Sequence, residues 1–150
     1  MIEIERARPT DRMAIEGLLA ANGLPEAGLE FALGAALVAR GDAGIVGFAA
    51  VEIYGSDGLL QSVCVEPDHR GIGLVRRLVE QAEALARQSG VDELFLLTET
   101  AAEWFPRLGY RPGRRESAPA PLQTSPEFTG ACPVGAALFR KRLSRAATVA

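Results

Sequence analysis

The sequence is poor in the residues that build disulfide frameworks, metal sites and membrane spans. It holds two cysteines, Cys64 and Cys132, and one histidine, His69, too few for a disulfide scaffold or a structural zinc site. No apolar run approaches the roughly 20 residues of a membrane-spanning helix, and the first residues lack the basic and apolar parts of a secretion signal. These absences predict a cytoplasmic protein with buried free thiols, no metal and no membrane partner.

Positive charge is also scarce. Sixteen Lys and Arg residues against nineteen Asp and Glu residues give a net charge of −3, so no overall positive field is available to hold nucleic acid. Apolar residues, in contrast, make up 48% of the chain, which excludes a disordered protein. At 150 residues the chain has the size of one domain. We therefore expect a single domain over residues 1–150, with residues 144–150 frayed, that binds any anion through a local site.

The spacing of apolar residues predicts an alternation of strands and helices. Three strands separated by glycine-rich turns form an antiparallel meander in the first half. The strongest helix runs from Gly73 to a cap at Gly90, because apolar residues recur on one of its faces and charged residues on the other. The expected strands cover residues 2–5, 36–39, 45–54, 59–65, 91–98, 110–114 and 136–143, and the other helices residues 13–22, 25–33 and 101–108, with a proline-rich loop at 118–126.

The turn before the strongest helix has the composition of an anion site. It carries Arg70, Gly71 and Gly73 between an apolar strand and the helix. The first N–H groups of a helix, with the positive end of its dipole, attract an anion, and glycine lets the backbone approach a pyrophosphate closely. The turn lacks the Gly-Lys-Ser/Thr of a Walker loop and the third glycine of a dinucleotide fingerprint. It predicts a phosphate-containing ligand, with an ordinary glycine-rich connection as the alternative.

The same turn resembles the signature of the GNAT acyltransferases, Arg/Gln-x-x-Gly-x-Gly/Ala. The likeness extends to the strand at 60–65, to Pro67 and to the segment 104–110. It implies an α+β fold, a three-layer α/β arrangement with a mixed, mostly antiparallel sheet of six or seven strands and helices on both faces. It also implies acetyl-coenzyme A as co-substrate, with its pantetheine arm on the fourth strand and its pyrophosphate on the turn. The cofactor-binding residues so implied are Val63, Cys64, Val65, Arg70, Gly71, Ile72, Gly73, Leu74, Val75 and Phe105.

Two positions depart from this signature. Val75 stands where the family has Gly or Ala, so its branched side chain is expected to weaken or shift pyrophosphate binding. Phe105 stands where many members place a tyrosine that protonates the leaving sulfur. Because a phenyl ring donates no proton, the acid is Tyr54, a water molecule, or unnecessary.

A narrower resemblance is to the arsenic-resistance N-acetyltransferases, which implies acetylation of the α-amine of glutamate-like compounds, including arsinic and phosphinic analogues. That group carries Leu-Arg-Ser where this chain has Leu-Gln61-Ser. A cation for an acidic side chain is therefore missing, and Arg107, Arg111 and Arg114 are candidates to replace it. The matching motifs are Leu-Pro at 24–25, Val-Glu-x-Tyr-Gly at 51–55, Leu-Thr-x-Thr-Ala at 97–101 and Ser-x-Glu-Phe…Cys-Pro-x-x-Ala at 125–136.

Glu52 is the candidate general base or water relay. It is the one acidic residue in the β-prone run at 45–54, and partial burial there would make its carboxylate a better proton acceptor. A strand-end Glu that faces solvent is the alternative. A backbone N–H near Val63 is expected to polarise the thioester carbonyl, as a preorganised donor does in an oxyanion hole.

The substrate pocket is the least determined part of the site. The candidates for shaping it are Gln61, Ser62, Thr98 and Glu127, with a capping role for Thr98 and a surface position for Glu127 as alternatives. The sequence thus predicts an enzyme, an acetyl-coenzyme A dependent N-acetyltransferase that acts on a small-molecule amine by direct transfer in a ternary complex. A catalytically silent acyl-coenzyme A binding module and a protein N-acetyltransferase are the alternatives, and a homodimer is compatible with all three.

Overall fold

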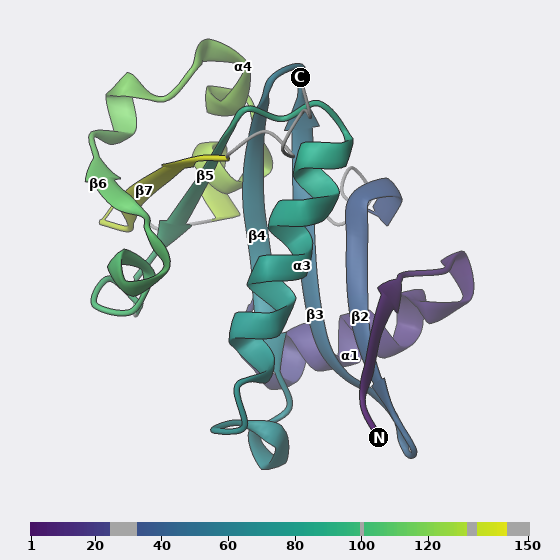
Figure 1. Cartoon of the computed structure of the whole chain (residues 1–150). Helices are drawn as coiled ribbons and strands as arrows, with labels where there is room; N and C mark the ends of the chain where they lie inside the picture. Colours follow the sequence, from purple (N-terminus) through teal and green to yellow (C-terminus); the bar gives the residue numbers. More distant parts are fainter. Residues whose placement is uncertain (25–32, 100, 132–134, 144–150) are drawn as a thin grey trace, which may run out of the picture.

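A single twisted sheet organises the chain, as seen in a computed structural model that describes residues 1–24, 33–99, 101–131 and 135–143 (Figure 1). The strand order is β1-β2-β3-β4-β5-β7-β6; β4 and β5 run parallel, and the other neighbours pair antiparallel. The strands are β1 (Glu3–Arg6), β2 (Ala36–Gly41), β3 (Gly44–Tyr54), β4 (Asp57–Val65), β5 (Glu93–Thr98), β6 (Arg111–Gly113) and β7 (Ala137–Arg142).

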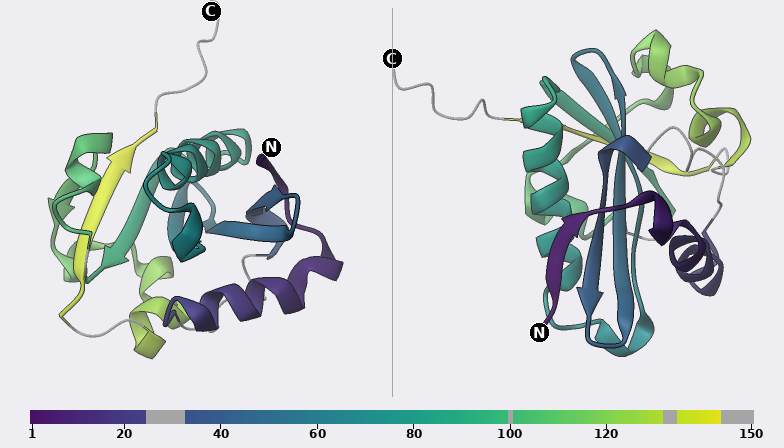
Figure 2. Two further views of the ribbon diagram at one scale, coloured as in Figure 1. Left: turned by 90° about the horizontal axis from the view of Figure 1, so that it is seen from below. Right: turned by 90° about the vertical axis from the view of Figure 1, so that its right-hand side faces the viewer.

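Helices cover both faces of this sheet, which confirms the expected fold class. Figure 2 shows α3 (Leu74–Gln88) on one face and α1 (Arg12–Ala21) with the short α4 (Ala120–Gln123) on the other. The alternation of β3 explains the two layers, because successive side chains of a strand point to opposite faces. Val51 packs into the core under α3, whereas Phe48 and Ala50 pack with the apolar side of α1. None of the helices in the described segments is both long and apolar enough to span a membrane.

A bulge in β4 separates this strand from β5. Phe48 pairs with Cys64 and Ala50 with Gln61, so two residues of β4, Ser62 and Val63, stand opposite a single residue of β3. Ser62 has a φ of 59°, the one positive value at a non-glycine position in the described chain. The bulge bends the strand and increases its twist. The parallel pairing of β4 with β5 accordingly ends at residue 59, and Figure 1 shows the two strands diverging toward the end where α3 begins.

Several predicted boundaries needed correction. The turn expected at 55–58 is tighter, because Tyr54 already pairs with Asp57. The helix expected at 101–108 is a 3-10 turn, η4 (Phe105–Leu108), which ends at Gly109 with a φ of 91°. The loop expected at 118–126 contains α4, whose first turn accommodates proline without losing a hydrogen bond. Most of the helix expected at 25–33, the frayed tail at 144–150 and Cys132 lie outside the described residues.

The remaining short elements join these layers. A π-helical turn, η6 (Glu127–Ala131), follows α4. The other short turns, like η4, are of the 3-10 type. They are η1 (Pro9–Asp11), η2 (Leu33–Ala35), η3 (Pro67–His69) and η5 (Arg115–Ser117).

Candidate functional site

The turn that precedes α3 presents unpaired backbone N–H groups. The first intrahelical bond runs from the N–H of Arg77 to the carbonyl of Gly73, at 3.1 Å, so the N–H groups of residues 74–76 precede the hydrogen-bonded ladder. Gly73, the N-cap, has a φ of 78° and Gly71 a φ of 83°. A Cβ at either position would meet nothing within 4 Å. Backbone conformation rather than space therefore requires glycine there.

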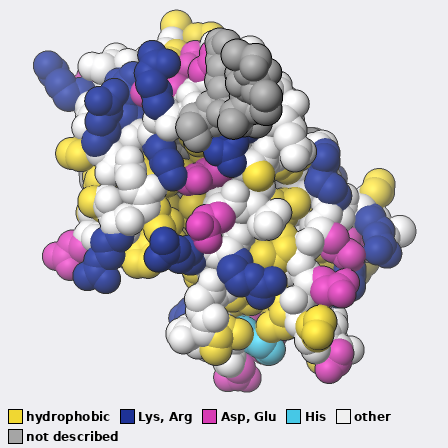
Figure 3. Space-filling model, viewed as in Figure 1, with side chains coloured by type: hydrophobic (Ala, Val, Ile, Leu, Met, Phe, Trp, Pro, Cys, Tyr) yellow, Lys and Arg dark blue, Asp and Glu magenta, His cyan; other side chains and the backbone are white. Residues whose placement is uncertain are grey.

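A hollow of about 380 Å³ opens at this helix N-terminus. We call it the loop hollow; its lining residues are His69, Arg70, Gly71, Gly73, Leu74, Val75, Arg76 and Trp104. The positive end of the α3 dipole and two guanidinium groups make it suited to an anion. On the face that carries α3, Lys and Arg side chains lie interspersed with acidic ones (Figure 3), which fits a local anion site better than a broad basic surface.

The side chains of the turn differ in their placement. Arg70 donates from Nη2 to Asn22 Oδ1, at 2.5 Å, and from Nε to the Val65 carbonyl, at 3.3 Å, which ties the turn to the end of α1. Ile72 is 62% exposed. Val75 is half-buried and packs on the core under α3 while it also lines the hollow. The turn therefore offers an anion its backbone N–H groups, and the guanidinium groups of Arg70 and Arg76 add positive charge at the lining of the hollow.

The thiol of Cys64 is buried where the pantetheine arm is expected. Burial raises the pKa of this thiol to about 12, although the Arg70 charge acts in the opposite direction. A thiol with so high a pKa is not a nucleophile near neutral pH. Val65 is buried as well, and Val63 is partly buried against the core under α3, so the side chains of this part of β4 contribute packing.

Glu52 lies at the centre of a buried polar cluster. Its side chain is 2% exposed, so the alternative of a solvent-facing strand end is wrong. Oε1 accepts a hydrogen bond from the Tyr54 hydroxyl at 2.5 Å and one from the Ser125 hydroxyl at 2.7 Å. Oε2 is buried and has no hydrogen-bond partner within the described part of the chain. Burial, and the hydrogen bond to Glu52, raise the pKa of Tyr54 to about 12, so its hydroxyl stays protonated.

Ser125 is the site residue that sequence reasoning missed. It is fully buried and lies 73 residues beyond the glutamate that it contacts. The Ser-x-Glu-Phe motif included it, but nothing in the motif indicated a partner. Its Oγ also accepts the backbone N–H of Glu127 at 3.2 Å, and Glu127 is 6% exposed. A surface position for Glu127 is therefore excluded.

The other predicted substrate residues have separate surroundings. Gln61 is buried on β4, opposite Ala50 and on the face to which Glu52 points. Ser62 forms the bulge described above. Thr98 accepts the backbone N–H of Ala101 on Oγ1 at 3.0 Å, so its hydroxyl caps the following turn.

Phe105 lies in the core under α3, 6% exposed. Its ring packs edge-on against Trp104 at 5.0 Å and Tyr110 at 5.4 Å between ring centroids. Trp104, one residue earlier, lines the loop hollow instead. The arginines considered as replacement cations are exposed, and β5 and β7 separate β6, which begins at Arg111, from β4.

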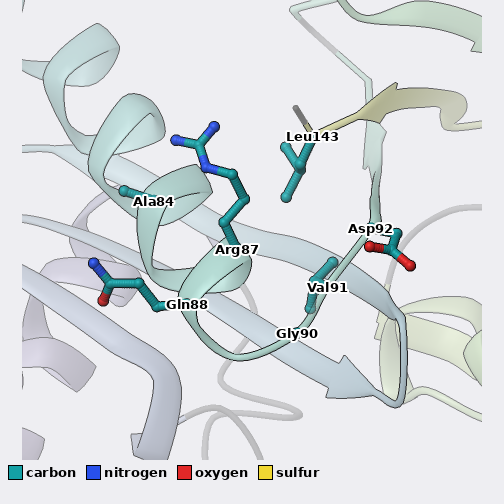
Figure 4. A pocket seen from close by; sticks show the side chains of 7 residues that line it. All are labelled: Ala84, Arg87, Gln88, Gly90, Val91, Asp92 and Leu143. Atoms are coloured by element: carbon teal, nitrogen blue, oxygen red, sulfur yellow. The ribbon is translucent and has the colours of Figure 1, made fainter. Parts of the chain in front are cut away.

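A second hollow, of about 550 Å³, lies at the C-terminal end of α3. Figure 4 shows the Arg87 side chain extending from the helix, while Asp92 lies on the connection to β5 and points away from the helix. None of the residues predicted from the sequence to form the site lines it. The candidate site therefore consists of the loop hollow, the bulged part of β4 and the Glu52 cluster.

Comparisons with known proteins identify the family. Residues 32–112, more than half of the chain, match the family model described as an acetyltransferase (GNAT) domain. The chain belongs to the GNAT acetyltransferase family.

Solved structures of similar fold agree with this assignment. N-acetylglutamate synthase from Neisseria gonorrhoeae, complexed with coenzyme A and N-acetyl-glutamate, superposes with a TM-score of 0.83 at 23% identity, over 97% of this chain and 36% of that one. A Mycobacterium tuberculosis protein in complex with CoA gives a TM-score of 0.77 at 22% identity, over 95% of this chain and 99% of that one. At these identities the likeness shows the fold.

Curated relatives at higher identity are similar to part of the chain. The amino-acid acetyltransferase of Azotobacter vinelandii is 38% identical over 94 residues, which cover 61% of this chain and 22% of that protein. The amino-acid acetyltransferase of Pseudomonas putida is 40% identical over 63 residues, 42% of this chain and 15% of that protein. The chain thus spans about a fifth or less of the length of these relatives.

Proposed function

We propose that the chain is an acetyl-coenzyme A dependent N-acetyltransferase that acts on the α-amine of a small amino acid or of a glutamate analogue of the arsinothricin or phosphinothricin type. The observation that carries this proposal is the buried Glu52 carboxylate with one bare oxygen, on the strand next to the bulge of β4. The names of the relatives, amino-acid acetyltransferases and an N-acetylglutamate synthase, support an amino-acid acceptor.

The loop hollow and the open edge of β4 fit acetyl-coenzyme A. The first N–H groups of α3, together with Arg70 and Arg76, would hold the pyrophosphate. The part of β4 beyond residue 59 is no longer paired with β5, so its backbone groups on that side can pair with the amides of the pantetheine arm. A backbone N–H near Val63 would then face the thioester oxygen and stabilise the charge that develops on it.

Glu52 would supply the base. Its Oε2 takes a proton from the ammonium group of the acceptor, and the free amine then attacks the acyl carbon. The new C–N bond forms as the C–S bond breaks, the nitrogen gives its surplus proton to water, and the thiolate sulfur takes a proton from water, because a coenzyme thiol is a fair leaving group and Tyr54 holds its own proton firmly. Both substrates are bound at once, so the transfer is direct, in a ternary complex.

The test combines calorimetric titration with acetyl-coenzyme A and thiol release on a panel of amines: glutamate, phosphinothricin, arsinothricin, a peptide and a polyamine. We expect binding, and turnover on the amino-acid analogues. Glu52→Gln should lower kcat by about a hundredfold or more, the usual contribution of a general base. Glu3→Gln, at an exposed site on β1, is the matched control and should leave turnover unchanged.

Three results would contradict the proposal in different ways. Binding without turnover on any amine would indicate a silent acyl-coenzyme A binding module, which the substitutions at Val75 and Phe105 would explain. Turnover confined to the peptide would indicate protein acetylation. Full activity of the Glu52→Gln variant would exclude Glu52 as the base while leaving the overall reaction standing.

A further inference from the structure

We propose that Ser125 is a positioning residue that, with Tyr54, fixes the carboxylate of Glu52 so that Oε1 is saturated by hydroxyl groups and Oε2 faces the acceptor amine. This inference rests on the proposed function and adds the residue that orients its base. It starts from the unequal partners of the two oxygens, because Oε1 accepts two hydrogen bonds and the buried Oε2 accepts none from any residue that the structure describes.

The direction of the Ser125 hydrogen bond follows from its neighbours. Its Oγ accepts the backbone N–H of Glu127 at 3.2 Å, so the hydroxyl hydrogen is free to point at Glu52 Oε1, 2.7 Å away. A carboxylate offers only acceptors, which settles Ser125 as the donor. The polar chain therefore runs from a backbone amide through the serine to the glutamate.

Ser125 is itself held firmly by the backbone. Its N–H donates to the carbonyl of Leu122 at 3.0 Å, and its carbonyl accepts the N–H groups of Phe128, at 2.9 Å, and of Thr129, at 3.0 Å. It thus stands at the junction of α4 and the π-helical turn η6, fully buried. A hydroxyl at so constrained a position, together with the Tyr54 hydroxyl on the same oxygen, fixes the rotation of the carboxylate that both bind.

The absence of a hydrogen-bond partner for Oε2 among the described residues suits Glu52 to act as a base. Leaving a buried carboxylate oxygen without a partner is unfavourable, and a second hydroxyl on Oε2 would have been the stabilising choice. With both hydroxyls on Oε1, a proton or an N–H group that reaches the carboxylate binds at Oε2.

Among the residues that the structure describes, few other titratable groups lie beside Glu52. Tyr54 lies on the same strand, and its pKa of about 12 keeps it protonated across the working range. On the covering segment, α4 carries no ionisable side chain and Glu127 begins η6. On β4, Leu59 pairs directly with Glu52, and the next residues on the same face are Gln61, which is uncharged, and Asp57, whose pKa is raised by burial and by the Glu93 charge. The acid limb of a pH profile can therefore be assigned by comparing variants at Glu52, Asp57 and Glu127.

The kinetic test is Ser125→Ala, with Thr124→Ala as the matched control. Thr124 is exposed on the same segment, and its hydroxyl bonds to the Pro121 carbonyl instead. We expect Ser125→Ala to lower kcat about tenfold, to leave the KM for acetyl-coenzyme A unchanged, and to move the acid limb of the kcat profile upward by about one pH unit, because the ionised base has lost a donor. Thr124→Ala should match the parent.

A double-mutant cycle separates positioning from a merely structural role. In a Glu52→Gln background, Ser125→Ala should cost little further activity, because the serine acts through the glutamate. Additive losses in the double variant would overturn the proposal, as would a parental profile in Ser125→Ala or loss of the acid limb in Glu127→Gln but not in Glu52→Gln. If Ser125→Ala does not fold, Tyr54→Phe removes the other hydroxyl and should shift the limb in the same direction.

A measurement that requires no turnover tests the role of Ser125 separately from the proposed function. In protein labelled with ¹³C at the glutamate carboxyl groups, the Glu52 signal is assigned by its absence from Glu52→Gln and is followed against pH by NMR. Its midpoint should rise by about one unit in Ser125→Ala and stay unchanged in Thr124→Ala. An unchanged midpoint in Ser125→Ala would overturn the inference, whereas absence of turnover in the parent protein would overturn only the proposed function.

Discussion

The contacts that Glu83 of α3 makes with β7 and with Tyr110 allow a prediction of how much they stabilise the fold. Glu83, in the middle of the helix, is 6% exposed. The Lys141 ammonium lies 3.1 Å from both of its carboxylate oxygens, and the Tyr110 hydroxyl donates to Oε2 at 2.8 Å. These contacts tie the helix whose N-terminus forms the loop hollow to β7 and to the residue before β6. We predict that Lys141→Met destabilises the fold more than any single hydroxyl deletion in this cluster.

The loss of unfolding free energy expected for Lys141→Met follows from the contacts that Glu83 would keep. Methionine keeps most of the apolar stem of Lys141, but Glu83 would retain one donor for a buried charge. Removing one partner of a buried ion pair costs about 3–5 kcal/mol. Because the Lys141 side chain is 27% exposed, water replaces part of the lost interaction, and we expect a loss of about 2–3 kcal/mol. For a domain of this size that corresponds to a Tm lower by roughly 4–12 °C.

The assay is urea and thermal unfolding followed by circular dichroism at pH 7. Tyr110→Phe is the comparison and should cost about 1 kcal/mol, the usual value for one hydrogen bond. The double variant Glu83→Gln with Lys141→Met should recover part of the loss, because no uncompensated charge is left in the core. A Lys141→Met protein within about 0.5 kcal/mol of the parent, or less destabilised than Tyr110→Phe, would refute the reasoning.

Three further outcomes follow from local contacts. The Arg140 guanidinium donates two hydrogen bonds to Glu93, at 2.7 and 3.0 Å, and holds the pKa of Glu93 below its ordinary 4.5. The resulting stabilisation is present above about pH 4.5 and is lost as the pH falls through the lowered pKa. In Glu93→Gln, the free energy of unfolding measured from pH 3 to 7 should therefore fall less steeply on the acid side. A Cβ at Gly47 would lie 2.9 Å from Leu78 Cδ1, so Gly47→Ala should lower the unfolding free energy in urea by about 1–3 kcal/mol. The Cys64 thiol, with a pKa of about 12, should react with iodoacetamide at pH 8 at least about a hundredfold more slowly in the native protein than in urea, as measured by peptide mass spectrometry.

Short-range sequence patterns predicted most of the fold. The helix from residue 74 to 88, the glycine turn before it and the β2–β3–β4 meander all depend on neighbours within a few positions, and the structure confirms them. The period of two in a strand also places Glu52 and Tyr54 on one face, because the two residues stand two positions apart in the same strand. Element boundaries were less certain, because the shift from turn to strand at residues 57–58 depends on pairing with a neighbouring strand.

The parts that sequence reasoning missed depend on long-range packing. The contact between Ser125 and Glu52 spans 73 positions and requires α4 to form inside a segment that prolines mark as a loop. The positive φ of Ser62 has no local signal, since serine rarely adopts this conformation. Phe105 and Trp104 are adjacent aromatics on a short turn, and only the packed structure shows which one enters the core and which one lines the loop hollow.

The bulge of β4 and the cluster on β3 depend on one another. Ser62 and Val63 turn β4 away from β5, which frees backbone groups on one side of β4 while its other side remains paired with β3. Glu52 lies on that paired strand, one alternating position beyond the Ala50–Gln61 pair that borders the bulge. A carboxylate at this position shares a face with Ala50 and Gln61, the pair that borders the bulge, yet it does not occupy the strand edge that an extended ligand would need. The base and the acyl-binding edge can thus be altered separately, so substitutions in the Glu52 cluster should change kcat without changing the affinity for acetyl-coenzyme A.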